Sequence, residues 1–260
     1  MKKIEAVIFD WAGTTVDFGS FAPVGAFLET FRIKGIEPTL DEVRAPMGML
    51  KKEHIRTMLE MERIENLYVE LYGHKYTETE LDEMYNFYEK ALISVLNDYA
   101  EPKPFVLDTI AKLREKGIKI GSTTGYNDKM MAVIVPKAEQ NGYSPDFWCS
   151  PDLVDSKSRP APFMVFRNME ELNISSVNAV VKVGDTVSDI EEGKNAGVVA
   201  VGIIEGSSVM GITEDEWNAM SDEQKIAEKI RVSKVYKDAG ADYVIDNMAD
   251  LLDVIALLEK

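Results

Sequence analysis

From Glu101 onward the chain alternates short apolar runs with helical patterns, and this alternation limits the possible folds more than any other feature. A helix-like stretch from Phe105 to Lys116 precedes one such run, with Gly117 between them as a helix stop. Strands that alternate with helices favour right-handed crossovers and a mostly parallel sheet covered on both faces. We therefore expect an α/β fold with a doubly wound, Rossmann-like parallel sheet, whose strands are Ala6–Phe9, Ile118–Thr123, Asp146–Cys149, Ala179–Asp185, Val198–Ile204 and Asp242–Ile245.

The stretch between the first strand and this alternating part differs, because it shows helical spacing and no convincing strand. A helical pattern from Glu42 to Met61 is interrupted at Pro46–Gly48, and Thr77–Glu80 has the form of a capping box that begins another helix. An all-helical block inserted after the first strand is typical of a separate cap domain. We therefore predict two domains, a catalytic α/β core of residues 1–18 and 101–260 and a helical cap of residues 19–100.

Three of the expected strands end at polar residues. Asp10 follows the first strand, Thr123 and Thr124 end the second, and Asp185 follows the strand that begins at Ala179. In open parallel sheets the ligand site lies at the carboxyl ends of the strands. We therefore expect these side chains to share one site.

Asp10, which is followed by the Gly/Thr-rich turn Trp11–Thr15, is the candidate nucleophile. A carboxylate presented at a strand end can attack phosphorus and form an aspartyl phosphate. Its charge must be shielded from an anionic substrate, most simply by Mg²⁺. Asp185 is the natural second metal ligand, and Asp189, on the first turn of the next helix, orients waters or backbone amides. The alternative for this second motif is an ordinary strand-ending turn with Ser188 as the helix N-cap.

Two further segments are candidates for binding a phosphoryl group. The hydroxyl of Thr124, with the exposed amides of Gly125 and Tyr126, can hold a phosphoryl oxygen, although an ordinary strand-to-helix turn has the same kind of sequence. Arg159 precedes a helix start marked by prolines, and its guanidinium suits a bidentate grip on phosphonate or phosphate oxygens. A lone arginine is otherwise most often a surface residue.

Composition excludes several classes of partner. The formal net charge of −16 argues against nucleic acid, because binding a phosphate backbone needs a basic face. No segment approaches the roughly 20 apolar residues of a membrane span. The single cysteine, Cys149, excludes an internal disulfide and fits a reducing compartment. We expect a cytoplasmic protein that acts on a small molecule, with no nucleic-acid or membrane partner.

Three motifs together resemble the haloacid dehalogenase superfamily: Ile8–Thr15, Ser122–Gly125 and Val183–Asp189. Within that superfamily, Phe9–Thr15 and Pro46–Lys51 are similar to the phosphonoacetaldehyde hydrolase family, and the similarity covers nearly the whole chain. The resemblance implies a doubly wound α/β core with a helical cap inserted after the first strand. It also implies a homodimeric, magnesium-dependent enzyme that cleaves the carbon–phosphorus bond of phosphonoacetaldehyde, giving acetaldehyde and phosphate.

Lys51 is the position that matches the family's Schiff-base lysine. A carbon–phosphorus bond has no good leaving group, but an amine that condenses with the aldehyde gives an iminium ion that can accept the bonding electrons. Adjacent helix residues point about 100° apart, so either Lys51 or its neighbour Lys52 faces the site, but not both. His54, one turn on, is a candidate for positioning or proton transfer. The amine must be neutral to attack, and Met47 is expected to supply apolar surroundings that lower the lysine pKa.

Ala12 stands where superfamily phosphatases and mutases carry an aspartate that protonates a departing oxygen. Electrons that flow into an iminium ion need no such acid, and the resemblance implies that the Ala12 carbonyl ligates magnesium. Tyr126, with an ordered water, is one candidate for activating the second hydrolysis. Ser20 and Ala161 depart from the residues usual in the family, and we expect them to affect pocket shape. The alternatives are a magnesium-dependent phosphomonoesterase or phosphoglucomutase-like enzyme, which Ala12 disfavours, a metal-free dehalogenase, and a catalytically silent dimeric regulator.

Overall fold

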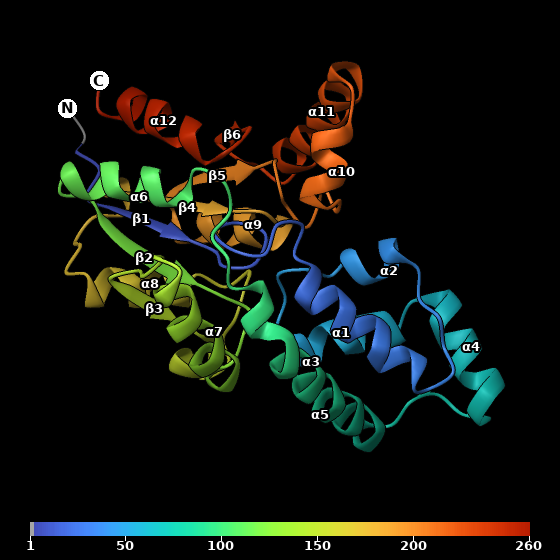
Figure 1. Cartoon of the computed structure of the whole chain (residues 1–260). Coiled ribbons are helices and arrows are strands. Elements are labelled where there is room, and N and C mark those ends of the chain that lie inside the picture. Colours follow the sequence, from blue (N-terminus) through green and yellow to red (C-terminus); the bar gives the residue numbers. More distant parts are fainter. Residues whose placement is uncertain (1–2) are drawn as a thin grey trace.

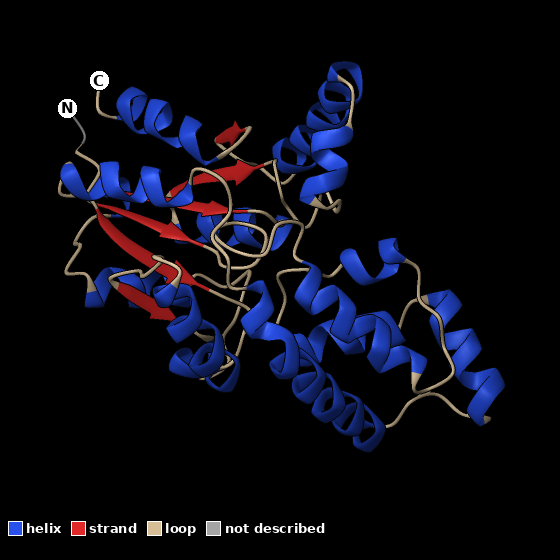
Figure 2. Cartoon of the chain, viewed as in Figure 1, coloured by secondary structure: helices blue, strands red, loops and turns tan. Residues whose placement is uncertain are grey.

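The computed structural model describes residues 3–260 and is built around a six-stranded parallel sheet (Figures 1 and 2). The strand order is β3-β2-β1-β4-β5-β6, so the chain moves outward from β1 first in one direction and then in the other. Every neighbouring pair in this sheet is parallel. The expected doubly wound α/β fold is confirmed, with strands β1 (Ala6–Phe9), β2 (Lys119–Thr123), β3 (Phe147–Cys149), β4 (Val180–Gly184), β5 (Val199–Ile203) and β6 (Tyr243–Ile245).

Helices cover both faces of the sheet, as the alternating side chains of β1 require. Val7 and Phe9 belong to one buried apolar cluster, whereas Ala6 and Ile8 pack in another, which includes residues of α8. Helices α6 and α12 pack together on the first face, and α8 and α9 contact each other on the second. The helices of this core are α6 (Val106–Glu115), α7 (Asp128–Gln140), α8 (Phe163–Glu171), α9 (Val187–Ala196), α10 (Glu214–Ala219), α11 (Asp222–Asp238) and α12 (Leu251–Leu258).

Five further helices form a segment that lies beyond the carboxyl ends of the strands (Figure 1). Helices α1 and α5 pack along each other, and Phe27 of α1 stacks on Tyr88 of α5 with ring centroids 4.2 Å apart. Thr77 caps α5 in the expected capping box, and the expected break at Pro46–Gly48 separates α2 from α3. The helices are α1 (Phe21–Arg32), α2 (Leu40–Arg44), α3 (Lys51–Leu59), α4 (Glu62–Tyr72) and α5 (Glu78–Val95).

The chain passes between the core and this helical segment twice, and the two connections lie side by side. Val16 forms an isolated β-bridge with Pro102, and the amide of Lys103 donates to the carbonyl of Thr15 over 2.9 Å. The domain boundaries at residues 18/19 and 100/101 stay a prediction, and residues 1 and 2 of the expected core lie outside the described part of the chain.

The turn after β4 begins helix α9 at a residue other than Ser188, the N-cap expected from the alternative interpretation of its sequence. Thr186, not Ser188, is the N-cap of α9. The Thr186 hydroxyl accepts from the amide of Asp189 over 3.2 Å, and the Asp189 carboxylate accepts from the amide of Thr186 over the same distance. A capping box therefore fixes the start of α9 and the direction of Asp189. Over residues 3–260, no helix combines the length and the apolar character that crossing a membrane requires.

Candidate active site

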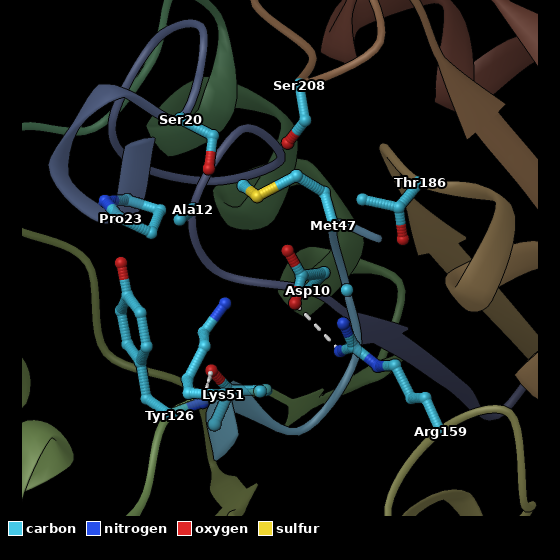
Figure 3. Close-up of a pocket in the computed structure, with 13 residues that line it drawn as sticks. Asp10, Ala12, Ser20, Pro23, Met47, Lys51, Tyr126, Arg159, Thr186 and Ser208 are labelled. Atoms are coloured by element: carbon cyan, nitrogen blue, oxygen red, sulfur yellow. Dashed lines mark hydrogen bonds and ion pairs between the residues drawn. The ribbon is translucent and has the colours of Figure 1, made fainter. Parts of the chain in front are cut away.

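A small cavity lies where the carboxyl ends of the strands meet the helical segment (Figure 3). Its walls come from both parts of the molecule, so the site is complete only when the helical segment lies against the core. The lining residues are Asp10, Ala12, Thr124, Gly125, Tyr126, Arg159, Thr186 and Ser208 from the core, and Ser20, Pro23, Met47, Gly48 and Lys51 from the helical segment and the connection to it.

Asp10 is placed by β1, the central strand of the sheet, and is almost completely buried. Its amide donates to the carbonyl of Val183 over 3.0 Å, which continues the pairing of β1 with β4 by one residue. One carboxylate oxygen accepts from Nη2 of Arg159 over 2.7 Å. The carboxylate is thus held at the floor of the cavity by a rigid strand and a single charged donor.

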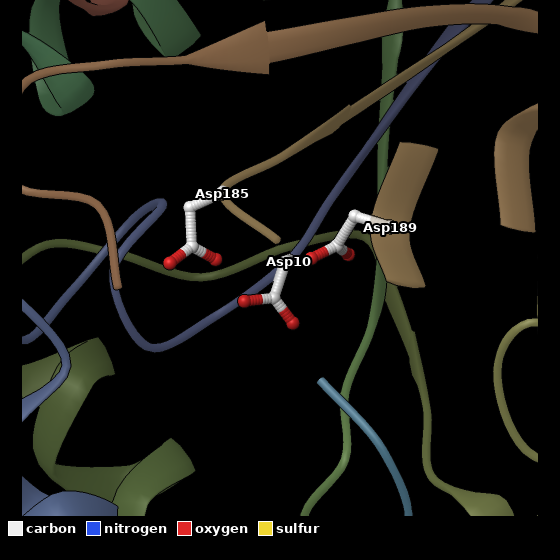
Figure 4. Close-up of side chains that lie close together, drawn as sticks. All are labelled: Asp10, Asp185 and Asp189. Carbon is white, nitrogen blue, oxygen red and sulfur yellow. The ribbon is translucent and has the colours of Figure 1, made fainter. Parts of the chain in front are cut away.

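Three carboxylates meet beside this floor: Asp10, Asp185 and Asp189 (Figure 4). One oxygen from each lies within 4.8 Å of the others. Burial, together with the charges of Asp10 and Asp189, raises the pKa of Asp185 to about 7. The two oxygens of Asp185 accept hydrogen bonds from the hydroxyls of Thr14 and Ser208, over 3.1 and 2.6 Å. These bonds fix the direction of Asp185 but bring no positive charge.

Asp189 differs from the other two because two buried cations, not one or none, form ion pairs with it. Its Oδ1 lies 2.7 Å from Nζ of Lys182 and 3.0 Å from Nη1 of Arg159. Burial raises the pKa of Asp189, but these two cations outweigh it and hold the pKa below its usual value. The donor set therefore fits a divalent cation held by Asp10 and Asp185, with Asp189 as a supporting residue. Oxygen ligands of this kind are those that Mg²⁺ prefers.

The turn after Asp10 leaves room for such a site only because Gly13 lacks a side chain. A Cβ at Gly13 would lie 2.1 Å from Oδ2 of Asp185, and its φ of +85° is a left-handed conformation that favours glycine. Ala12 borders the cavity one residue earlier. The buried ammonium group of Lys103, which follows the helical segment, donates a hydrogen bond to the carbonyl of Gly13.

Arg159 is buried, not a surface residue. Besides Asp10, it contacts Asp189 and the carboxylate of Glu192, whose Oε2 accepts from Nε over 3.0 Å. Its Nη2 also donates to the hydroxyl of Thr123 over 2.6 Å. Two strand ends and one helix therefore hold the guanidinium at the cavity floor, and these partners take up four of its five N–H donors.

Lys51 opens α3, directly after the interruption at Pro46–Gly48, and its side chain reaches into the cavity (Figure 3). Its Nζ lies 5.5 Å from the ring centroid of Tyr126 and 5.8 Å from that of Phe27. Burial lowers the pKa of Lys51 to about 8, against the opposing effect of the Asp10 charge. Lys52 points elsewhere and pairs with Asp82 at the surface of the helical segment.

His54 is not among the residues that line the cavity. Its ring stacks on Phe27 with centroids 3.7 Å apart, and its Nε2 lies 2.8 Å from the carbonyl of Val43. Burial lowers its pKa well below the usual value. The structure therefore places His54 behind Phe27, where it supports the wall beside Lys51 and does not reach a ligand in the cavity.

The remaining predicted residues, Thr124, Gly125, Tyr126 and Met47, also line the cavity. The hydroxyl of Thr124 accepts from the amide of Tyr126 over 3.0 Å, so it shapes the turn as well as facing the cavity. A Cβ at Gly125 would lie 3.1 Å from the carbonyl of Met49 in the helical segment. The Tyr126 hydroxyl is buried and has no hydrogen-bond partner among residues 3–260. Met47 borders the cavity as expected from its apolar side chain.

Sequence reasoning missed several residues that complete the site. Glu192 pairs with Arg159, which holds Asp10, while Lys182 pairs with Asp189 and Ser208 holds Asp185. Lys182 carried a usable signal, because a lone lysine within the apolar run of β4 must be neutralised if it is buried. Ser208 carried none, since its loop follows β5 without any motif. Of the two departures from the family pattern, Ser20 lines the cavity, whereas Ala161 is not among its lining residues.

Comparison with known proteins agrees with this geometry. The model of the haloacid dehalogenase-like hydrolases matches residues 4–197. The phosphonoacetaldehyde hydrolase of Lysinibacillus sphaericus is 49% identical over 96% of the chain and 93% of its own length. That of Bacillus cereus is 47% identical over 99% of the chain and 97% of its own length. The chain belongs to the haloacid dehalogenase-like hydrolases, and within them to the phosphonoacetaldehyde hydrolase group.

A longer relative and two solved structures are also similar to this chain. A bifunctional phosphonoacetaldehyde hydrolase/aminoethylphosphonate transaminase of Clostridioides difficile is 48% identical over the whole chain, which spans only 41% of that longer protein. The crystal structure of a phosphonoacetaldehyde hydrolase-like protein from Oleispira antarctica has a TM-score of 0.95 at 38% identity and covers 98% of this chain and 92% of that one. A β-phosphoglucomutase from Clostridium difficile, at 17% identity and a TM-score of 0.69, shares the fold.

Proposed function

We propose that the chain hydrolyses the carbon–phosphorus bond of phosphonoacetaldehyde to acetaldehyde and phosphate. The observation that carries this proposal is that Lys51 and Asp10, both buried, line the same cavity. A carboxylate alone suits many phosphoryl transfers, but a buried amine beside it is the group that carbon–phosphorus cleavage needs. The names of relatives that are 47–49% identical support the same substrate.

Lys51 carries the first step in this proposal. Its neutral Nζ adds to the aldehyde carbon, and loss of one water leaves an iminium ion on the two-carbon chain. The lowered pKa of Lys51 keeps a useful fraction of the amine neutral near pH 7. The rings of Tyr126 and Phe27 flank Nζ and tolerate the positive charge of the iminium ion that forms.

Asp10 carries the second step. Its carboxylate oxygen attacks phosphorus, the carbon–phosphorus bond breaks, and the bonding electrons pass into the iminium group to give an enamine. The enamine takes up a proton at carbon, and one water hydrolyses the resulting imine to acetaldehyde and free Lys51. A second water releases phosphate from the aspartyl phosphate. One water is lost and two are consumed, so the net reaction is a hydrolysis.

The other residues of the cavity have supporting roles in this proposal. Arg159 neutralises phosphonate oxygens and holds Asp10, while Thr124 and Gly125 border the opposite side. Asp10, Asp185 and the carbonyl of Ala12 would hold Mg²⁺, which supplies positive charge between the Asp10 carboxylate and an anionic substrate. Asp189 fixes Arg159, and Met47 and His54 build the wall around Lys51. A homodimer and a cytoplasmic location are further proposals, supported by the family resemblance and by the one buried free cysteine.

The test compares two neighbouring lysines. Lys51→Arg should reduce acetaldehyde release from phosphonoacetaldehyde to background. Arginine keeps the positive charge, but its guanidinium stays protonated and forms no imine with the aldehyde. Lys52→Arg, the matched control, should retain wild-type turnover, since its side chain pairs with Asp82 outside the cavity. A phosphomonoesterase would instead hydrolyse an aryl phosphate equally well with and without Lys51. Full acetaldehyde release by Lys51→Arg would refute the proposed mechanism.

A further inference from the structure

Arg44, the last residue of α2, reaches out of the helical segment to two backbone carbonyls. Its Nη1 donates to the carbonyl of Gly19 over 3.0 Å and to that of Ser208 over 2.9 Å. Gly19 lies in the connection that leads into α1, and Ser208 lies in the loop that follows β5. One nitrogen therefore joins three parts of the molecule: the helical segment, its connection and the core.

The guanidinium of Arg44 is held tightly by shape as well as by these bonds. It lies over the ring of Phe21, 5.1 Å from the centroid. On another side, a Cβ at Gly211 would fall 2.9 Å from Nε, and Gly211 has a φ of +71°. Nε and Nη2 are buried without a hydrogen-bond partner within residues 3–260. The directional contacts of the group are thus concentrated on Gly19 and Ser208.

Ser208 is held from the opposite side by the candidate metal ligand. Its amide and its hydroxyl both donate to Oδ2 of Asp185, over 2.7 and 2.6 Å. The loop that contains Ser208 also accepts a hydrogen bond from the connection that leads into α1, because the amide of Gly19 donates to the carbonyl of Gly206 over 2.8 Å. A single residue, Ser208, therefore lies between Arg44 of the helical segment and Asp185 of the core.

The cavity lies between the two parts of the molecule, so their separation opens it. Asp10 from the core and Lys51 from the helical segment both line it and are both buried. A substrate that contacts both must enter while the helical segment is displaced from the core, and the contacts of Arg44 with Ser208 are then broken. Re-forming them restores a hydrogen bond from a charged donor to the residue that holds Asp185.

We propose that Arg44 is a positioning residue that couples closure of the helical segment to the placement of Asp185 through Ser208. This inference rests on the proposed function for its catalytic consequence, but the contact itself does not depend on which substrate is used. Charged donors form strong hydrogen bonds, so loss of both should shift the balance between closed and open states by at least about tenfold.

The matched control is Arg231 of α11, which donates to the carbonyl of Val209 in the same loop over 2.7 Å but, within residues 3–260, makes no hydrogen bond to the helical segment. Arg44→Gln should increase amide hydrogen exchange at least about tenfold in residues 17–22 and 205–212, with β1 and β4 unchanged. Its kcat/KM for phosphonoacetaldehyde should fall at least about tenfold, mainly through kcat, because Asp185 would hold the metal ion that shields the charge of Asp10. Arg231→Gln should leave exchange in residues 17–22 and kcat/KM at wild-type values.

Two results would overturn the inference: wild-type exchange in both segments of Arg44→Gln, or faster exchange throughout the sheet, which would show a merely structural role. If Arg44→Gln does not fold, Arg44→Lys replaces it, and exchange above wild type in the same two segments is expected. Hydrogen exchange is measured without substrate. A wild-type protein that leaves phosphonoacetaldehyde intact would therefore refute the proposed function, while the exchange data would still test the contact.

Discussion

The pH dependence of imine formation should report the environment of Lys51. Burial lowers the pKa of this amine to about 8. At pH 7 about 9% of the side chain is then neutral, against about 0.03% for a lysine of ordinary pKa, a gain of about 300-fold in the reactive form. Because only the neutral amine attacks, the rate should rise as the pH increases through 8. It should grow about 50-fold between pH 6 and pH 8 and level off above pH 9.

The assay is the initial rate at which borohydride traps the substrate on the protein, measured from pH 6 to pH 10. Met47→Glu supplies a matched perturbation, because Met47 borders the same cavity and a nearby carboxylate stabilises the charged amine. Its profile should shift upward by about one pH unit or more relative to Met47→Gln, which adds polarity without charge. An inflection near the ordinary lysine value, or identical profiles for the two variants, would refute the reasoning.

Three other substitutions test the packing around the site. Lys182→Met removes a cation that pairs with the buried carboxylates of Asp189 and Glu192, and it should lower the free energy of unfolding measured in urea by about 3–5 kcal/mol. The control Lys194→Gln breaks an exposed ion pair with Asp242 and should lower it by less than about 1 kcal/mol. Gly48→Ala should reduce kcat/KM at least about tenfold, because a Cβ at this position would lie 2.4 Å from the Thr186 hydroxyl. The control Gly73→Ala should keep the wild-type kcat/KM, because Gly73 has a similar positive φ but no atom within 4 Å of the added Cβ. His54→Leu should reduce the loss of folding stability below pH 6.5, because His54 stays neutral in the folded protein but takes up a proton when the chain unfolds. In the wild type this difference lowers the free energy of unfolding by up to about 1.4 kcal/mol per pH unit as the pH falls. Equal slopes for the two proteins would contradict the buried, neutral state of His54.

The sequence predicts the sheet, the inserted helices and the strand-end positions of Asp10 and Asp185 because these depend on local periodicity. The apolar run before Asp10 and the capping box at Thr77 carry their structural meaning within a few residues. The helix angle between Lys51 and Lys52 shows that only one of them faces the site. It does not show which, because that depends on how α3 lies against the core.

The parts that the sequence does not predict depend on contacts between distant segments. Arg159, in the loop before α8, can be buried because Asp189 and Glu192 of α9 neutralise its charge. His54 has the spacing to share a face with Lys51, but its ring stacks on Phe27 of α1 and it is not among the residues that line the cavity. Ser208 meets Asp185 only because β5 lies next to β4 in the sheet. Local patterns therefore locate the nucleophile, while the groups that orient it follow from tertiary packing.

The central claim is that Lys51 carries the carbon fragment while the bond to phosphorus breaks. The most direct measurement is to incubate the protein with phosphonoacetaldehyde, reduce it with borohydride and map the modified peptide by mass spectrometry. We expect an ethyl group on Nζ of Lys51, which is the two-carbon fragment without phosphorus. No substrate-dependent adduct on Lys51, or an adduct confined to Lys52, would contradict it.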